Sequence, residues 1–442
     1  MMRALYSGVA GLRTHQTRMD VIGNNIANVN TVGFKSETVT FNDVLYQTTQ
    51  HASGANQETG AGGTNAKQIG LGSAVNAIST KITETGGYQT TNNPFDLMIN
   101  GDQFFIVNNS GMNYFTKAGN FKVDTLGTLV TSQGYAVMGW LADQEGNIQV
   151  DNVSRINLYA PEYKQAEPMA STDVSITGNI NKEDESFGSE GGTRAVNVSF
   201  YDNLGYKYQL TIQISQNDDS EFGYSLSSAA LTCNGNPVAG LTEANIQSIL
   251  GTGAAIEFNE ADGTVATPAD GKITLNIAGL GIAALPEDIS LDVSTITCRG
   301  TETKLEASRG DVTNGNSGAG RTVGTMSEVS IAKDGKISAS YDNGEQRVIA
   351  QIAVASFVNP SGLEKVGDNL FEATLNSGEF DGIGEDITAS GGYFAPGVLE
   401  MSNVDLAAEF TDMITTQRGY QANSRIITVS DTLLEELINL KR

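Results

Sequence analysis

The sequence predicts a mainly β protein with α-helical termini, in which the N- and C-terminal helices pair as a coiled coil and the middle forms two discontinuous antiparallel β domains. Three observations predict this class. Glycine supplies 50 of the 442 residues and charged residues only 17%, a composition typical of turns and short strands. Apolar residues recur in a near-heptad pattern at both ends of the chain. Between the ends, apolar and polar residues alternate as they do in half-buried strands.

The N-terminal segment carries a stripe of apolar residues spaced by three or four positions, without a proline. This periodicity predicts an amphipathic helix. Its stripe consists of Leu5, Val9, Leu12, Met19, Ile22, Ile26 and Val29, interrupted by the polar Gln16. Packing on a globular core is the common role of such a helix. A second helix at the other terminus favours pairing of the two stripes, or their burial against neighbouring subunits.

The C-terminal segment repeats this pattern, so a second amphipathic helix is expected there. Its stripe consists of Leu406, Phe410, Met413, Tyr420, Ile427 and Leu434. Gln417, Ser424 and Asp431 occupy intervening positions, which makes the seam imperfect. Further apolar residues near the C-terminus widen the apolar face.

The middle of the chain is predicted to form strands joined by short turns. Residues 97–107 contain the turn Asn100-Gly101-Asp102, which predicts a hairpin. Residues 196–214 predict a second hairpin, and residues 329–357 predict a meander of three strands. Small polar residues dominate 51–65 and glycines dominate 309–324, so both segments are expected to be loops or linkers.

These patterns divide the chain into four predicted parts, each of the first three assembled from two segments. An acidic, glycine-rich stretch after residue 165 marks the start of an insertion. The expected parts are a terminal helical domain (1–32 and 399–442), a linker or extended region (33–75 and 361–398), a first β domain (76–168 and 302–360) and an inserted outer β domain (169–301).

The charge is unevenly distributed along the chain. Lys and Arg number 26 against 51 Asp and Glu, a net charge of −25. Residues 1–30 carry +2 and residues 401–442 carry −2, so the middle holds the excess of acid. Binding to nucleic acid is disfavoured because no segment concentrates the basic residues that neutralise phosphates.

Catalytic motifs are missing from the sequence. The two histidines, His15 and His51, lie on the predicted helix and in a predicted loop, which are poor places for a nucleophile–histidine site. The sequence contains no zinc-binding pair of cysteines, no phosphate loop and no dinucleotide-binding loop. We therefore expect no enzyme activity, no cofactor and no metal site.

Both ends of the chain resemble the signatures of bacterial flagellar rod and hook proteins. Residues 5–12 and 19–35 match the N-terminal signature, and residues 402–410 and 413–425 match the C-terminal one. Residues 96–107 are similar to the family's shared first β domain. The motif residues are Gly23, Asn24, Asn25, Ala27, Asn28, Gly33, Phe34, Asn403, Asp405, Gln417, Arg418, Tyr420, Gln421 and Asn423.

Within this family, the length of 442 residues and the large insertion are typical of hook subunits. The resemblance implies self-assembly into a curved, flexible tube, a universal joint that transmits torque from rod to filament, with the helix stripes buried on assembly. It implies as partners further copies of the chain, the distal rod protein, the hook cap, the hook-filament junction protein and the flagellar type III export apparatus. It places the chain in the flagellar basal body and hook, outside the cell after export, without membrane insertion.

Two other functions stay open at this point. A distal rod protein of the same family would form a straight, rigid tube. A secreted β-rich adhesin or carbohydrate-binding protein would bind its ligand without either terminus. Cys233 and Cys298 lie in the insertion; some hook proteins use a cysteine for a covalent lysine cross-link between subunits, while two inert thiols are the simpler interpretation.

Overall fold

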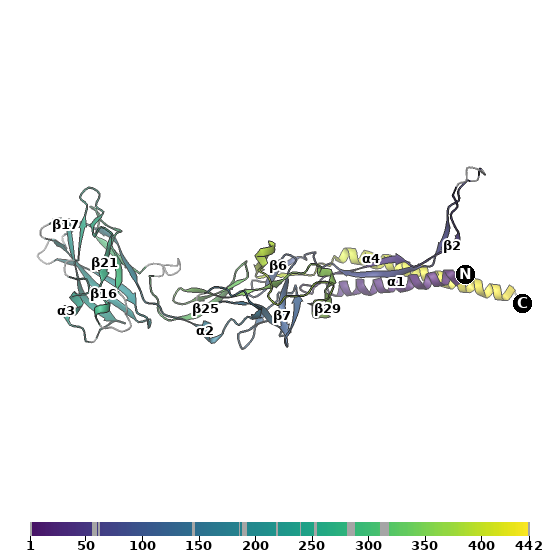
Figure 1. Ribbon diagram of the computed structural model, residues 1–442, viewed down its shortest axis with the longest axis horizontal. Coiled ribbons are helices and arrows are strands. Elements are labelled where there is room, and N and C mark those ends of the chain that lie inside the picture. The colour runs from purple at the N-terminus through teal and green to yellow at the C-terminus, as the bar shows by residue number, and fades with distance from the viewer. Residues whose placement is uncertain are drawn as a thin grey trace. The chain divides into compact units, whose positions relative to one another are not determined.

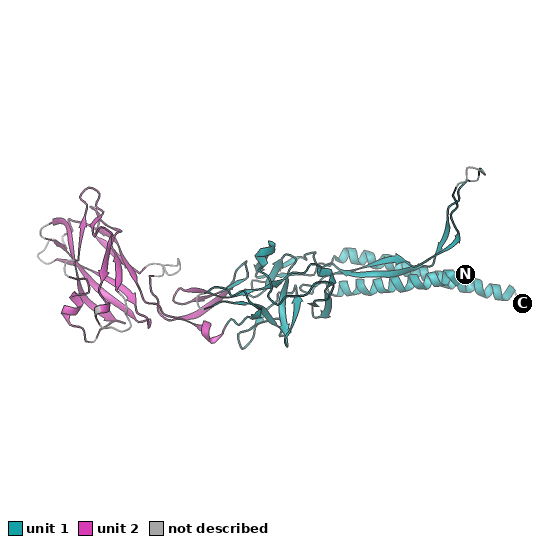
Figure 2. Cartoon of the chain, viewed as in Figure 1, with its two compact units in different colours: residues 1–158, 331–337, 348–442 teal, residues 159–330, 338–347 magenta. Residues whose placement is uncertain are grey.

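A computed structural model describes residues 2–440 except for 55–59, 61, 144–145, 185, 188–191, 218–219, 239, 252–253, 281–287 and 310–317. The predicted fold class is confirmed, since the chain is mainly β with a long helix near each end (Figure 1). It divides into two compact units (Figure 2): residues 1–158, 331–337 and 348–442 form unit 1, and residues 159–330 and 338–347 form unit 2. Among the described helices, none is both long and apolar enough to cross a membrane.

The two long helices of unit 1 are α1 (Met2–Ala27) and α4 (Leu406–Leu440), and they pack against each other. Their directions are antiparallel, because Gly8 of α1 lies against Ile427 while Arg18 pairs with Asp412. α1 ends at Ala27, and Asn28 and Asn30 follow it. Asp405 precedes α4 and accepts hydrogen bonds from the amides of residues 407 and 408, which satisfies two free donors of the first turn.

Two antiparallel ribbons follow α1. β1 (Glu37–Asp43) pairs with β4 (Ser73–Thr80), and β2 (Tyr46–Gln50) pairs with β3 (Lys67–Gly70). The first ribbon packs against α1 through both strands. Most side chains of the second ribbon are exposed.

The β body of unit 1 is built around a sheet in the order β27-β11-β7-β8-β30-β29. Aromatic rings and the side chain of Trp140 fill its core. The strands that lie wholly within this β body are β5 (Tyr88–Thr90), β6 (Leu97–Asn100), β7 (Phe104–Asn109), β8 (Met112–Thr116), β9 (Lys122–Val123), β10 (Leu129–Val130), β11 (Ala136–Leu141), β12 (Ser154–Arg155), β28 (Val354–Ala355), β29 (Glu364–Gly367), β30 (Leu370–Glu372), β31 (Tyr393–Pro396) and β32 (Val398–Glu400). Short 3-10 helices lie at Pro360–Gly362 and Ile387–Ser390. β25 (Gly324–Ile331), β26 (Lys336–Tyr341) and β27 (Gln346–Ile352) contain residues of both units.

The predicted hairpin at residues 97–107 is wrong. β6 pairs with β31, a strand almost 300 residues later in the chain, whereas β7 pairs with β8, β11 and β28. The turn sequence permits a hairpin, but β6 is almost entirely buried and obtains its backbone partners from the returning segment instead.

Unit 2 has its own apolar core between two sheets. The first sheet is ordered β21-β22-β14-β23 with β24 on β14, and the second is ordered β15-β16-β17-β19-β20 with β18 on β17.

The predicted hairpin at 196–214 is confirmed by the pairing of β15 with β16. β14 pairs in parallel with β22 and β23, which departs from the expected all-antiparallel arrangement; over 100 residues separate these strands, enough for a crossover. The elements are α2 (Pro161–Lys164), β13 (Gln165–Ala166), β14 (Asp173–Ile180), β15 (Thr193–Tyr201), β16 (Lys207–Asn217), β17 (Ser220–Cys233), β18 (Asn236–Pro237), α3 (Glu243–Gln247), β19 (Ala255–Phe258), β20 (Val265–Thr267), β21 (Lys272–Leu275), β22 (Ile289–Asp292), β23 (Ile296–Cys298), β24 (Lys304–Ser308) and a 3-10 turn at Ala278–Leu280.

The predicted linker at 51–65 and loop at 309–324 lie partly outside the described residues.

Candidate assembly site

The junction between the helix pair and the β body contains a buried ion pair. Lys35 Nζ lies 2.7 Å from Glu400 Oε1, and both side chains are 1% exposed. Lys35 also donates to the carbonyl of Glu84, and Glu400 accepts from the amide of Gly86. The residues of the pair belong to the segment that leaves α1 and to the strand that precedes α4. The ion pair therefore joins the outgoing and returning chains at one point.

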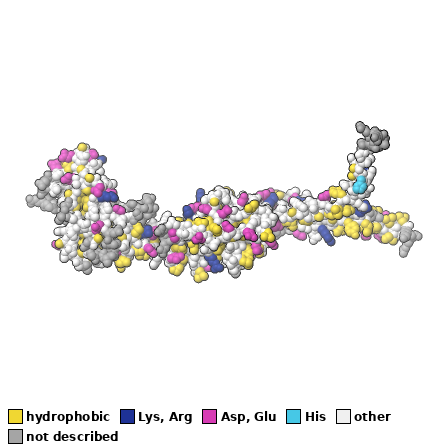
Figure 3. All heavy atoms as spheres, viewed as in Figure 1, with side chains coloured by type: hydrophobic (Ala, Val, Ile, Leu, Met, Phe, Trp, Pro, Cys, Tyr) yellow, Lys and Arg dark blue, Asp and Glu magenta, His cyan; other side chains and the backbone are white. Residues whose placement is uncertain are grey.

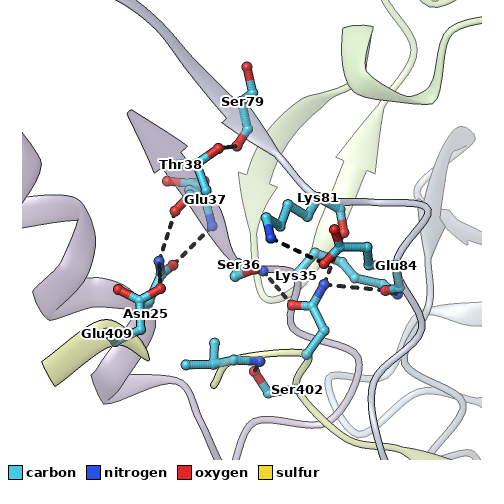
Figure 4. Close-up of polar contacts among 12 residues, drawn as sticks. Asn25, Lys35, Ser36, Glu37, Thr38, Ser79, Lys81, Glu84, Ser402 and Glu409 are labelled. Carbon is cyan, nitrogen blue, oxygen red and sulfur yellow. Dashed lines mark hydrogen bonds and ion pairs between the residues drawn. The ribbon is translucent and has the colours of Figure 1, made fainter. Parts of the chain in front are cut away.

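Asn25 connects the end of α1 to two other elements (Figure 4). Its Oδ1 accepts from the amide of Glu37 at 3.0 Å, and its Nδ2 donates to the carbonyl of the same residue at 2.8 Å. Nδ2 also donates to Glu409 Oε1 of α4 at 2.9 Å. Asn25 is fully buried. Burial raises the pKa of Glu409, and the hydrogen bond from Asn25 opposes that rise.

Asn403 makes the same kind of connection from the C-terminal side. Its Oδ1 accepts from the amide of Ser36 at 2.8 Å, and its Nδ2 donates to the carbonyls of Lys81 and Glu84. Side chains here substitute for missing sheet partners, because the backbone between helix and strand has no regular neighbour. We call Asn25, Lys35, Glu400 and Asn403 the junction clasp.

Other motif residues shape the turn after α1. Asn28 donates to the carbonyl and Oδ1 of Asn24 and accepts from Thr31. Gly33 has φ +69°, and a Cβ there would lie 2.7 Å from the amide nitrogen of Ala118. Only glycine fits that conformation and that space. Phe34 is buried beneath the amino group of Lys365, 5.0 Å from the ring centroid.

Small residues, rather than the apolar stripes, form much of the contact between α1 and α4. Gly8 and Gly11 are buried, and a Cβ on Gly11 would meet the Asn423 side chain at 2.6 Å. Across the interface, Gly419 lies under His15, whose ring atoms would be 2.8 Å from a Cβ. The apolar periodicity of the two helices does not predict this contact. The signal available was the i, i+3 spacing of Gly8 and Gly11 on one helical face.

His15 of α1 packs against two other elements. It lies against Gly419 of α4 and packs edge-on against Phe41 of β1, with ring centroids 6.0 Å apart. Its buried Nδ1 has no hydrogen-bond partner among the described residues. Burial, and then the nearby Arg18, lower its pKa, so the imidazole is neutral at pH 7. Arg18 in turn pairs with Asp412 at 2.9 Å.

The predicted stripe residues mostly remain accessible to solvent in the single chain. Ile22 is the one fully buried member. Half-buried members are Leu5, Leu12, Met19, Ile26, Val29, Met413, Ile427 and Leu434, while Val9, Leu406, Phe410 and Tyr420 are exposed. Hydrophobic side chains gather along the helix pair towards the C-terminal end of α4 (Figure 3). There Ile426, Val429, Leu433, Leu437 and Leu440 form an exposed stripe.

The remaining motif residues lie on the outer surface of the two helices. Gly23 has open space around its Cα, and Ala27 is exposed at the end of α1. Gln417, Arg418 and Gln421 are exposed on α4, with Arg418 Nη1 3.5 Å from Gln421 Oε1. These residues are free to contact another molecule.

Both cysteines lie in unit 2 as free thiols. Cys298 is buried, and burial raises its pKa, which lowers its nucleophilicity at neutral pH. Cys233 is half-buried beside Tyr208, and burial, more than this thiol, raises the pKa of that tyrosine to about 12. Within the described residues, no group of three or more His, Cys, Asp or Glu side chains could hold a metal ion.

Three family models match the chain. One described as flagellar basal body rod FlgEFG protein C-terminal matches residues 395–440. One described as flagellar hook protein FlgE/F/G D1 domain matches residues 98–181, and one described as flagella basal body rod protein matches residues 5–35.

Curated relatives align with the whole chain. The flagellar hook protein FlgE of Borreliella burgdorferi (strain B31) is 39% identical, and that of Treponema pallidum (strain Nichols) is 34% identical, each alignment covering 100% of both chains. The flagellar basal-body rod protein FlgG of Bacillus subtilis (strain 168) is 30% identical with the same coverage. A crystal structure of the Helicobacter pylori hook protein FlgE2 covers 69% of this chain and 98% of its own, with 14% identity and a TM-score of 0.40.

Proposed function

Because the chain belongs to the flagellar hook protein family, we propose that it is a structural subunit of the bacterial flagellar hook. Many copies would assemble into a curved, flexible tube, a universal joint that transmits torque from the rod to the filament. The observation that carries this proposal is the similarity to hook proteins at 39% identity, in an alignment that covers 100% of both chains. The chain is a structural protein rather than an enzyme.

The helices supply the self-association surface. Copies related by a rotation and a translation make heterologous contacts that do not close, and such contacts build a tube. The half-buried and exposed stripe residues of α1 and α4 become buried when neighbouring helix pairs pack around the tube's channel. The exposed motif residues Gln417, Arg418 and Gln421 belong to the same contact surface with neighbouring copies.

The junction clasp carries torque between the inner helices and the β body. A flexible linker would let the helices turn independently of the body. The buried amide of Asn25, the half-buried amide of Asn403 and the buried ion pair resist that rotation, because relative movement breaks their hydrogen bonds and leaves polar groups unpaired.

The partners follow from the place of the hook. Besides further copies of itself, the chain contacts the distal rod protein, the hook cap and the hook-filament junction protein. It leaves the cell through the flagellar type III export apparatus, and it resides in the flagellar basal body and hook. We propose that the four predicted domains form the layers of this assembly.

A distal rod protein is the second candidate, favoured by the 30% identity to the rod protein FlgG along the whole chain. The two candidates differ in the shape of the polymer. A hook subunit forms curved tubes and a rod subunit forms straight ones.

The test is to polymerise the purified full-length chain and to view the product by electron microscopy. We expect curved tubes; straight tubes would support the rod candidate, and the absence of tubes would contradict both. Limited proteolysis gives an independent measurement. A stable fragment within about residues 70–365 is expected not to polymerise, since it lacks both helices, and a fragment that still forms tubes would overturn the role given to the helices.

A further inference from the structure

Two turns of the unit 1 β body hold a pair of aliphatic side chains entirely in solvent. Val358 is 100% exposed and Leu375 is 94% exposed, although a solvent-exposed leucine or valine gains nothing from folding. They lie in the turns 357–363 and 373–378, which we call the double turn. Scattered exposed aliphatic residues are common on proteins, so the rigidity and charge of this pair's surroundings decide its interpretation.

The double turn is rigidly built. Asn359 Nδ2 donates to the carbonyl of Asn376 at 3.1 Å, and Thr374 Oγ1 donates to the carbonyl of Gly362 at 2.6 Å. Ser377 is 1% exposed, and its hydroxyl bonds within the second turn. A surface that is already ordered loses little entropy on binding, so the double turn is preorganised for a contact.

Aromatic rings anchor the double turn to the core on both sides. Phe357, directly before Val358, packs edge-on against Phe115 with ring centroids 4.8 Å apart, and also against Phe104. Phe380, shortly after the second turn, packs against Phe115 at 5.3 Å. The two aliphatic side chains therefore project from a fixed base.

The charge of the surroundings argues for a second copy of this chain as the partner. Copies with a net charge of −25 repel one another, and this repulsion is weakest where neutral surfaces meet. Residues 357–363 and 373–378 contain no charged residue, although Glu364, Glu372 and Glu379 lie directly beside them. The double turn is thus a neutral apolar tip within an acidic rim.

A hollow lies at the other end of the same hairpin. β29 and β30 pair with Glu364 opposite Glu372 at the end next to the double turn, and Asp368 and Asn369 form the turn at the far end. That far end lines a hollow of about 300 Å³, where small exposed parts of the largely buried Phe34, Leu370 and Phe371 lie among polar side chains that include Asn24, Asn28 and Lys365. A tip and a hollow at opposite ends of one element suit head-to-tail contact, which is the type that propagates an open array.

We propose that the double turn inserts Val358 and Leu375 into the hollow lined by Phe34, Leu370 and Phe371 of the next copy of this chain. This contact rests on the proposed function, because it operates within the polymer. It adds a contact between β bodies to the helix contacts.

The first experiment compares the critical concentration for polymerisation of the full-length chain with that of two double variants. Val358→Ser/Leu375→Ser is expected to raise it at least about tenfold, since two buried aliphatic contacts are lost. Leu126→Ser/Val150→Ser is the matched control, because these side chains are 75% and 60% exposed in turns of the same unit. Thermal unfolding followed by Trp140 fluorescence should be unchanged in both variants.

The outcomes separate this proposal from the proposed function. No tubes from the unmodified chain would overturn the proposed function. Tubes from the unmodified chain with an unchanged critical concentration for Val358→Ser/Leu375→Ser would overturn the contact alone. An equal rise for Leu126→Ser/Val150→Ser would also overturn it, because the effect would not be specific to the double turn.

A second experiment tests the hollow. Chains carrying Leu375→Cys and chains carrying Asp368→Cys, both with Cys233→Ser, are copolymerised and oxidised. We expect a disulfide-linked pair joining residues 375 and 368 on non-reducing gels, identified by mass spectrometry. A mixture of Leu375→Cys with Leu126→Cys is the control. Linkage to residue 126 in place of residue 368 would overturn the assignment of the hollow.

Discussion

Lys35 and Glu400 are separated by 365 residues in the chain and form a fully buried ion pair. Such a pair is costly to form, because both charges leave water, and the two surrounding backbone hydrogen bonds compensate only in part. The ion pair instead fixes the geometry of the junction, where α1, the start of the β body and α4 converge.

Removing one partner of this pair is expected to destabilise unit 1 strongly. Lys35→Met leaves the Glu400 carboxylate buried and unpaired, so the free energy of unfolding should fall by about 3–5 kcal/mol. The double variant Lys35→Met/Glu400→Leu should recover most of that loss, because no buried charge remains. Urea denaturation of the two variants and the unmodified protein measures both effects, and equal losses in the single and double variants would contradict the explanation.

His15 gives the helix pair a dependence on pH. Its pKa in the folded protein is below the unfolded value of 6.5, so at pH values between the two the unfolded chain binds a proton that the folded protein does not. The free energy of unfolding should therefore decrease as the pH falls below about 6.5. Above that pH both states are neutral and His15 adds no pH dependence.

The measurement is thermal stability between pH 5 and 7. His15→Leu should reduce the loss of stability on acidification, whereas His51→Gln, which changes the chain's other histidine, should not. A pH profile of His15→Leu identical to that of the unmodified protein would assign the effect to the carboxylates.

At the scale of elements, the contact between α1 and α4 depends on close approach. Gly8 and Gly11 on one helix and Gly419 on the other leave room for His15 and Asn423 of the partner helix. Glycine inside a helix costs about 1 kcal/mol relative to alanine, so its presence is explained by the space that it leaves. Ile427 of α4 packs against Gly8 in this contact, whereas Val9 and Phe410 are exposed.

Two glycine-to-alanine changes in these helices should have opposite effects. Gly419→Ala places a Cβ 2.8 Å from the His15 ring and should lower the free energy of unfolding by about 1–3 kcal/mol, because the ring must shift within a packed interface. Gly23→Ala meets no atom within 4 Å and should raise stability by up to about 1 kcal/mol through helix propensity. Circular dichroism at 222 nm during thermal unfolding compares them, and a stabilising Gly419→Ala would show that the interface is loose.

At the scale of the whole molecule, folding and assembly use different surfaces. The β bodies of both units bury their apolar residues within one chain. The C-terminal stripe of α4 does not, since Leu433, Leu437 and Leu440 are exposed in the single chain. Residues with this exposure contribute little to folding and can contribute fully to association.

Leu433→Ser/Leu437→Ser/Leu440→Ser is therefore expected to leave the melting temperature of the monomer within about 2 °C of the unmodified value, since exposed substitutions have small effects. The same triple variant should fail to form tubes at concentrations where the unmodified chain does. Sedimentation and electron microscopy measure assembly, and normal assembly would remove the stripe from the contact surface.

Local patterns in the sequence were sufficient for the secondary structure of the ends and for one hairpin. A 3.6-residue apolar period with no proline determines α1 and α4, and the alternation at 196–214 determines β15 and β16, because both patterns act over neighbouring residues. The sequence likewise carries the terminal signatures that identify the family.

Only the tertiary structure decided which residues meet across long separations. The clasp joins Lys35 to Glu400 and Asn403 to Ser36, and β6 finds β31 instead of the nearby β7. It also placed glycines in the helix interface and left most of the apolar stripe only half-buried in the single chain. These outcomes depend on how buried polar groups obtain partners and how closely backbones approach, and neither is encoded in the period of a single segment.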